Sequence, residues 1–322
     1  MKADLFRKPE LGSLLALLFL SLLFSLVSPH FHTLETWGAI ITSSTDLGIL
    51  ALGVCILMIA GEIDLSVGSI FAASGVLYAQ GSLFWDWSPW LAAPVALGLG
   101  ASMGFVNGYL TVKTKLPSFI ITLGSMLFWQ GVVLVLTHGF PISDIEQKAG
   151  LKGLSHEVFF SFRGSFVLWI VLSLFLHYLL TRNKLGNWIL ASGGNEQAAF
   201  ALGIPSGSVK VFCFTLTGLL SALAALVQFA HLESISPLSG DQYQLKAIAI
   251  AVMGGTSLSG GKGTVIGTVL GTLIMGVLTT GLVQAGVSNY WFRTFVGLII
   301  ILAVLMNGKL QALPFSRKEA SS

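Results

Sequence analysis

The sequence predicts an all-α, polytopic membrane protein with about ten transmembrane helices, in a range of roughly eight to ten, and with both termini in the cytoplasm. Three observations lead to this fold class: the composition, the apolar runs and the distribution of basic residues. Of the 322 residues, 54% are hydrophobic and only 10% are charged, whereas a soluble domain usually carries about 25% charged residues. So few charges cannot cover a water-soluble surface, so the apolar runs are expected to lie in lipid.

Several apolar runs reach the roughly 20 residues that a transmembrane helix needs. They cover residues 11–28, 40–60, 65–80, 91–112, 118–137, 165–181, 211–231, 265–284 and 291–307. A shorter run at 243–255 is either a tenth span or a re-entrant segment. The first run is longer than the apolar core of a signal peptide and lacks a small-x-small cleavage pattern, so we interpret it as a retained helix.

The basic residues indicate the orientation of these runs. With the N-terminus in the cytoplasm and ten alternating helices, most of the 17 basic residues fall on the cytoplasmic side: Lys2, Arg7, Lys8, Lys113, Lys115, Arg182, Lys184, Lys210, Lys262, Lys309, Arg317 and Lys318. The bias predicts cytoplasmic termini and an even number of spans. The expected organisation is a cytoplasmic segment (1–10), one transmembrane domain (11–308) and a cytoplasmic tail (309–322).

Composition also excludes several classes of function. The net charge of +3 forms no basic cluster, so nucleic acid is excluded as a partner. Cys55 and Cys213 each lie inside an apolar run, which favours simple packing over a disulfide or a metal site. The chain contains no H-E-x-x-H and no G-x-S-x-G motif, and its six histidines are scattered. We therefore expect neither an enzyme nor a metal centre.

The segment 61–69 (GEIDLSVGS) places two carboxylates between two apolar runs. Acidic side chains near a membrane are costly and indicate function by default. Asp64 or Ser66 could also cap the following helix, because their oxygens can accept from the free N–H groups at a helix start. The residues alone support function and capping equally.

The longest predicted cytoplasmic segment, 185–210, contains a short helix with its own caps. Asn195 is a favourable N-cap, and Glu196 suits the positive end of the helix dipole. Gly203 is the expected left-handed residue after the helix, and Pro205 prevents continuation. Such a helix indicates a cytoplasmic partner. The alternative is a helix lying on the bilayer, which usually carries Lys or Arg on its polar face.

The glycine-rich segment 253–264 (MGGTSLSGGKGT) resembles a phosphate-binding loop only superficially. The pattern G-x-x-x-x-G-K-[ST] requires glycine where Thr256 stands, and Ser or Thr where Gly263 stands. No other segment carries the pattern, so any use of ATP must be supplied by another chain, and no cofactor is expected in this one. This segment and 61–69 follow similar apolar runs, a weak internal repeat of the kind that transporters often contain.

Some glycines recur at small-xxx-small spacing, notably Gly100 and Gly104, and also Gly263, Gly267 and Gly271. This spacing lets helix backbones approach closely in lipid. We expect these glycines to serve helix packing.

Taken together, the motifs resemble the permease subunits of carbohydrate ABC importers of the ribose, xylose and autoinducer type. The matching segments are GEIDLSVGS at 61–69, NGYLTVKTKLPSFIITLGSM at 107–126, GNWILASGGNEQAAFALGI at 186–204 and KAIAIAVMGGTSLSGGKGTVIGTVLG at 246–271. The resemblance covers nearly the whole chain and implies a permease of the bacterial inner membrane that pairs with a second copy or a paralogue around a central pathway. It also implies cytoplasmic ATP-binding subunits, which would hold ATP and Mg²⁺, and a periplasmic or lipid-anchored sugar-binding protein.

The resemblance also implies roles for individual residues. The segment 186–204 would form the coupling helix that meets the ATPase, a role carried to Gly194, Asn195, Glu196 and Gly203. The segment 61–69 would lie near the pathway or its inner gate, with Asp64 as the matching residue. The family often has glycine at position 62, so the resemblance carries no role to Glu62.

The expected function is import of a monosaccharide or a similar small polyol by alternating access. A polar pathway with few charges suits a neutral polyol, and the candidate side chains are Asp46, Asp64, Ser66, Asn107, Gln130 and Gln228. Two alternatives stay open: a related permease for branched-chain amino acids or nucleosides, and a secondary transporter in which acidic side chains would carry protons or sodium.

Overall fold

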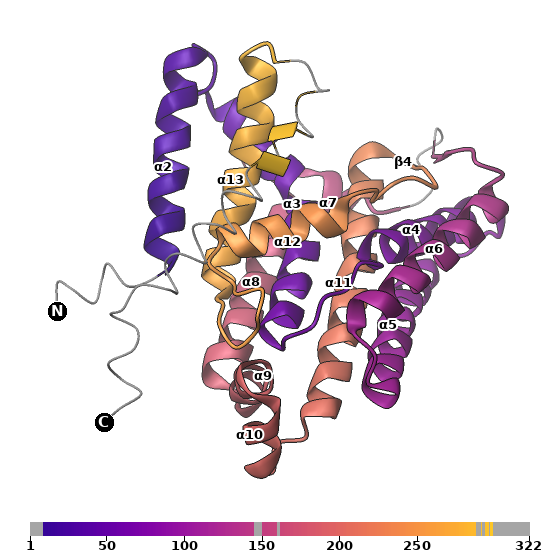
Figure 1. Cartoon of the computed structure of the whole chain (residues 1–322). Coiled ribbons are helices and arrows are strands. Elements are labelled where there is room, and N and C mark those ends of the chain that lie inside the picture. Colours follow the sequence, from indigo (N-terminus) through magenta and orange to yellow (C-terminus); the bar gives the residue numbers. More distant parts are fainter. Residues whose placement is uncertain are drawn as a thin grey trace.

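The structure, a computed structural model, describes residues 9–144, 150–159, 162–287, 291, 294–295 and 297–298. Within these residues, 8 helices are long and apolar enough to cross a membrane. They are α2 (Pro9–Val27), α3 (Leu34–Ile59), α4 (Val67–Phe84), α5 (Pro89–Thr114), α6 (Ser118–Thr137), α8 (Gly164–Arg182), α11 (Ser206–Leu232) and α13 (Val265–Gln284). Figure 1 shows their arrangement.

Shorter elements connect the long helices. The helices are α7 (Lys152–Ser155), α9 (Lys184–Gly194), α10 (Glu196–Ala201) and α12 (Tyr243–Met253), and the strands are β1 (Ile142–Ser143), β2 (Glu157–Phe159), β3 (Phe162–Arg163) and β4 (Ser234–Ile235). β1 pairs antiparallel with β4, and β2 pairs antiparallel with β3. The register of the first pair sets Ile142 opposite Ile235.

The all-α class is confirmed, and the predicted apolar runs from 11–28 to 265–284 coincide with the long helices to within a few residues. Only scattered residues of the predicted run 291–307 are described, and the predicted tail 309–322 lies outside the described residues. Of the predicted N-terminal segment, Pro9 and Glu10 already belong to α2. The cytoplasmic position of both termini stays a prediction.

α12 is too short to cross a membrane as a helix. Its 11 residues give a length of about 16 Å at ~1.5 Å per residue, whereas the hydrocarbon core is about 30 Å thick. Figure 1 shows α12 lying crosswise against α3 and α13. The run predicted at 243–255 therefore forms a short, partly buried helix, and the loop 254–264 continues from it towards α13.

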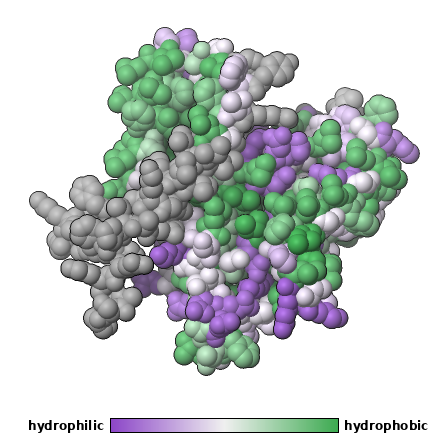
Figure 2. Space-filling model, viewed as in Figure 1, coloured by the Kyte–Doolittle hydropathy of each residue, from purple (hydrophilic) through white to green (hydrophobic). Residues whose placement is uncertain are grey.

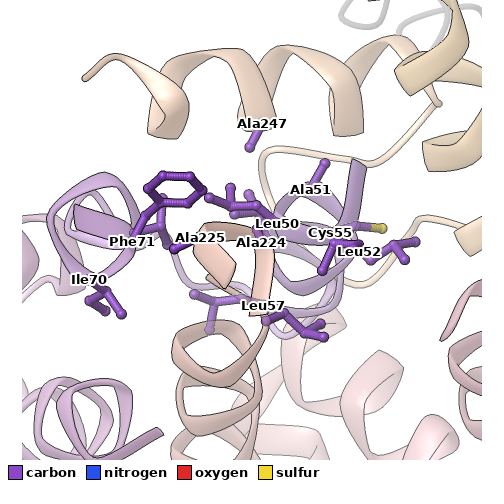
Figure 3. Packing of buried hydrophobic residues seen from close by; sticks show 14 of the residues in the cluster. Leu50, Ala51, Leu52, Cys55, Leu57, Ile70, Phe71, Ala224, Ala225 and Ala247 are labelled. Carbon is purple, nitrogen blue, oxygen red and sulfur yellow. The ribbon is translucent and has the colours of Figure 1, made fainter. Parts of the chain in front are cut away.

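α3 is the centre of the fold. From Ser44 to Ala60 nearly every residue is buried, because α8, α9, α11, α12 and α13 all contact this helix. Figure 3 shows Leu50 of α3 among Phe71 of α4, Ala224 of α11 and Ala247 of α12. A helix that is apolar on all sides belongs in such an interior position.

α2 and α6 have the opposite character. Large apolar side chains on both are exposed, among them Phe19 and Leu26 of α2 and Phe128 and Val135 of α6. Figure 2 shows the hydrophobic surface over α2. Outward apolar side chains on a spanning helix are those that face lipid or another membrane subunit.

α5 and α11 pack through small residues. A Cβ added at Gly100 would lie 2.6 Å from both Ala222 Cβ and the Gly218 carbonyl oxygen, and one at Gly104 would overlap the Phe214 carbonyl oxygen. α12 and α13 meet in the same way, with Gly267 against Gly254 and Gly271 against Ile250. The predicted packing roles of these glycines are confirmed. Gly263 also makes a close contact, against Ile59 and Thr256, but it lies just before α13.

This packing predicts that Gly104→Leu destabilises the protein, because the new side chain would force α5 away from α11. Overpacking of this kind typically costs about 1–3 kcal/mol. Gly98→Leu on the same helix is the matched control, because a Cβ there meets nothing within 4 Å. Thermal unfolding in detergent can be followed with a thiol-reactive dye, since Cys55 and Cys213 are both buried. Equal midpoints for the two variants would contradict the prediction.

Candidate functional site

The predicted short helix exists as α10, and its caps are those that the sequence indicates. The Asn195 side-chain oxygen accepts from the Ala198 N–H at 3.0 Å, which satisfies one of the free donors at the helix start. At the other end Gly203 has a φ of +77°, and the Ile204 N–H donates to the Ala199 carbonyl at 3.0 Å. A left-handed glycine is the usual way to end a helix so abruptly.

α10 presents an apolar surface away from the bundle. Phe200 is 78% exposed and Leu202 is 81% exposed, while Ala199 is buried against the protein. Figure 1 places α10 at the lower end of the molecule, and Figure 2 shows a hydrophobic cap there below a hydrophilic band. A cavity of about 720 Å³ opens beside it, lined by Tyr109, Val112, Phe200, Pro205 and Val211 among others. Exposed large apolar groups beside a cavity suit a protein partner.

α9 precedes α10 and was not predicted from the sequence. Its N-cap is Asn183, whose side chain accepts from the Leu185 N–H at 3.0 Å. The buried positions are Gly186, Ile189 and Ser192, three residues apart, so they lie on one face of the helix. This spacing and the Asn183 cap are the signals from which α9 could have been found.

The end of α9 meets two loops in a cluster of five glycines, here called the glycine junction: Gly61, Gly193, Gly194, Gly260 and Gly261. A Cβ added at Gly193 would overlap the Ile59 carbonyl oxygen, and one at Gly260 would lie 2.6 Å from the Gly193 carbonyl oxygen. The Gly261 N–H donates to the Ile59 carbonyl at 2.8 Å. The backbones at the end of α3, at the end of α9 and in loop 254–264 therefore touch directly, and only glycine allows so close an approach.

The glycine junction accounts for glycines of the segment 253–264, which do not fit the phosphate-loop pattern. Two of those glycines lie against the ends of α3 and α9. The junction also brings together the two halves of the weak internal repeat, because Gly260 of loop 254–264 lies against Gly61 of loop 60–66. The two loops are far apart in the sequence, so their spacing along the chain does not predict that they lie close together.

The loop 60–66 is held by a buried polar cluster. Asp64 accepts from the Ser66 N–H at 2.7 Å and from the Ser66 hydroxyl at 2.6 Å, and the Asn107 amide donates to the Ser66 hydroxyl at 2.8 Å. From α6, the Ser118 and Thr122 hydroxyls accept from the backbone N–H groups of residues 63 and 65. Burial raises the pKa of the Asp64 carboxyl, and the hydrogen bonds from Ser66 oppose this effect. Three predicted site residues, Asp64, Ser66 and Asn107, are thus brought together.

The capping role considered for this loop takes a different form. Ser66 is the N-cap of α4, but its side chain caps no helical N–H group. Asp64 instead accepts from Ser66 itself, so it fixes the turn that leads into the helix. Both side chains are almost completely buried.

Asp46 and Gln228 form a second cluster together with Tyr243, which the sequence did not single out. The Gln228 amide donates to the Asp46 carboxylate at 2.9 Å and approaches the Tyr243 hydroxyl at 2.7 Å. The Lys246 ammonium lies 5.3 Å from the centre of the Tyr243 ring. Gln130 on α6 is half-buried and takes part in neither of the two clusters. Paired polar groups inside spanning helices avoid the cost of an isolated buried charge.

The glycine junction predicts that Gly193→Ala disrupts the contact between α9 and α3. The neighbours on both sides are backbone atoms and cannot rotate away, so we expect a loss of thermal stability of about 1–3 kcal/mol. Gly124→Ala on α6 serves as the control, because a Cβ there meets nothing within 4 Å. A Gly193→Ala midpoint equal to that of the control would disprove the contact.

The Asp64 cluster predicts different outcomes for two substitutions. Asp64→Ala leaves the Ser66 donors without their acceptor, and a buried donor left unpaired costs about 1–3 kcal/mol. Asp64→Asn keeps one acceptor oxygen and should retain most of the stability. Unfolding midpoints of the two purified variants measure the difference. The cluster has no bracing role if alanine is tolerated as well as asparagine.

Comparison with known proteins shows the family to which the chain belongs. Residues 37–304 match the family model described as branched-chain amino acid transport system / permease component. The ribose import permease protein RbsC of Escherichia coli (strain K12) is 38% identical over 305 residues, 94% of this chain and 94% of the relative. RbsC of Bacillus subtilis (strain 168) is 37% identical, with the same coverage. The autoinducer 2 import system permease protein LsrC of Photorhabdus luminescens is 31% identical, over 94% of this chain and 90% of the relative. The chain therefore belongs to this family of transport-system permeases, as a multi-pass protein of the bacterial inner membrane.

Proposed function

We propose that this chain is the transmembrane pathway subunit of an ATP-driven importer, which moves a monosaccharide or similar small polyol inward by alternating access. The observation that carries the proposal is α10, a capped helix with exposed Phe200 and Leu202 that is joined through α9 to the glycine junction. A partner that pushes on α10 would move the loops at the ends of α3 and α12.

The substrate class is supported by the relatives and by the polar residues. The relatives are named for import of ribose and of autoinducer 2. The buried polar groups of the spanning helices are mostly hydroxyls and amides, with Asp46 as an acidic exception. Such groups suit hydrogen bonding to a neutral polyol better than neutralisation of a charged substrate.

Family membership implies ATP-binding and substrate-binding partners. In the proposed assembly, cytoplasmic ATPase subunits hold ATP and Mg²⁺ and dock on α10. A periplasmic or lipid-anchored sugar-binding protein delivers the substrate at the opposite side, and a second copy or a paralogue of this chain completes the pathway. The ATPase contact would include Gly194, Asn195, Glu196 and Gly203, because these residues end α9 or start and end α10.

The two polar clusters receive separate roles in this proposal. The cluster of Asp64, Ser66 and Asn107 braces the inner gate, since these side chains bond to one another and fix the loop 60–66. Asp46 and Gln228 lie within spanning helices and contribute to the pathway. Gln130 contributes from α6, whose other side chains are largely exposed.

A second candidate substrate follows from the description of the matched family, which names branched-chain amino acids. Uptake into proteoliposomes that contain this chain, its ATPase and its binding protein separates the candidates. Labelled ribose should enter with ATP, and leucine should neither enter nor compete. ATP-independent uptake that an uncoupler abolishes would instead indicate an ion-coupled secondary transporter.

The docking role of α10 predicts that Phe200→Ala weakens binding of the ATPase subunit. Loss of a central aromatic contact at an interface typically costs about 2 kcal/mol or more, which is over tenfold in the dissociation constant. Binding of the purified ATPase to the permease in nanodiscs measures the effect.

The matched control is Phe19→Ala on α2, where the replaced side chain is similarly exposed, at 64%, but lies on a different surface. Asn195→Ala should also weaken binding, because loss of an N-cap destabilises the helix by about 1 kcal/mol. If Phe200→Ala binds the ATPase as tightly as Phe19→Ala does, the docking role of α10 is wrong.

A further inference from the structure

Lys210 forms ion pairs with two segments to which the resemblance gives different roles, the loop 60–66 and α10. Its ammonium nitrogen lies 2.8 Å from a carboxylate oxygen of Glu62 and 2.7 Å from one of Glu196. Lys210 belongs to the beginning of α11, Glu62 to the loop 60–66, and Glu196 is the first residue of α10. One cation thus bridges the loop 60–66 and α10.

The two ion pairs differ in their exposure. The side chains of Lys210 and Glu62 are each 12% exposed, whereas that of Glu196 is 55% exposed. Water screens the Glu196 contact and weakens it, while the shielded Glu62 contact is stronger. Lys210 is therefore held firmly to the loop, and its contact with α10 is the half that can break and form again.

The bridge complements the glycine junction. The junction attaches the residues before α10 to the end of α3 through Gly193 and Gly261, and buried Ala199 packs α10 itself against the protein. The Lys210 contact is a further attachment, at Glu196, and it links α10 directly to loop 60–66. Without the ammonium, the carboxylates of Glu62 and Glu196 would repel each other and drive α10 away from the loop.

We infer that Lys210 is a positioning residue that transmits the movement of α10 to the loop 60–66, with Glu62 as its fixed partner. The inference rests on the proposed function, because it requires an ATPase that acts on α10. It also gives a role to Glu62, to which the resemblance carried none. Loss of the bridge should uncouple ATP hydrolysis from transport and leave docking intact.

The test uses the full transporter in proteoliposomes and measures ATPase binding, ATP hydrolysis and labelled ribose uptake. Lys210→Met keeps the apolar stem and removes the charge. We expect ATPase binding and basal hydrolysis to stay close to the parent values, and uptake per ATP hydrolysed to fall about tenfold, within the range of typical coupling effects. Lys210→Arg should retain coupling, because the guanidinium still pairs with both carboxylates.

Two further variants distinguish a loss of coupling between ATP hydrolysis and uptake from a loss of folding stability. Glu62→Gln preserves the shape of the side chain, so it reports on the charge alone even if Lys210→Met folds poorly. Because both residues act through one contact, the double variant should be no worse than either single variant. Lys113→Met is the control, since Lys113 stacks on Tyr109 and lies outside the bridge.

The inference is overturned if Lys210→Met and Glu62→Gln keep the parent ratio of uptake to hydrolysis, or if their losses multiply in the double variant. Failure of the proposed function looks different. In that case the parent chain itself would bind no ATPase or show no ATP-dependent uptake, and the inference would fall with it.

Discussion

Close contact between backbones, made possible by glycine, is the constraint on which the rest of this structure depends. Helices in lipid gain little from hiding apolar side chains from one another, so they associate through tight packing. Here α5 approaches α11 at Gly100 and Gly104, and α12 approaches α13 at Gly267 and Gly271. A larger residue at any of these contacts would separate the helices around α3 and remove the support of its neighbouring loops.

The glycine junction applies the same constraint to the end of the bundle. The carbonyl of Ile59 receives a hydrogen bond from Gly261 and lies against Gly193. Three segments far apart in the chain are therefore in direct backbone contact. A connection of this kind suits the proposed role, in which a partner acts on α10 without contact to the substrate.

Polar groups inside the bundle follow a second constraint, the cost of leaving them unpaired at low dielectric. One carboxylate oxygen of Asp64 accepts from Ser66, and the Asp46 carboxylate accepts from Gln228. The Lys210 bridge obeys the same rule at the edge of the bundle, where partial exposure makes one of its contacts breakable. Buried polar contacts thus hold loop 60–66, and the more exposed contact lies at α10.

The sequence by itself determined the membrane class, the bounds of most long helices and the caps of α10, because run length, composition and capping are local properties. It also singled out Asp46, Asp64, Ser66, Asn107 and Gln228 as polar residues in apolar surroundings. Tertiary structure decided how they group, that α12 is too short to span, and that loop 254–264 packs against Ile59 and Gly193. The partnership of Lys210, Glu62 and Glu196 was equally hidden, since contacts between distant segments depend on how the helices pack and leave no periodic signal in the chain.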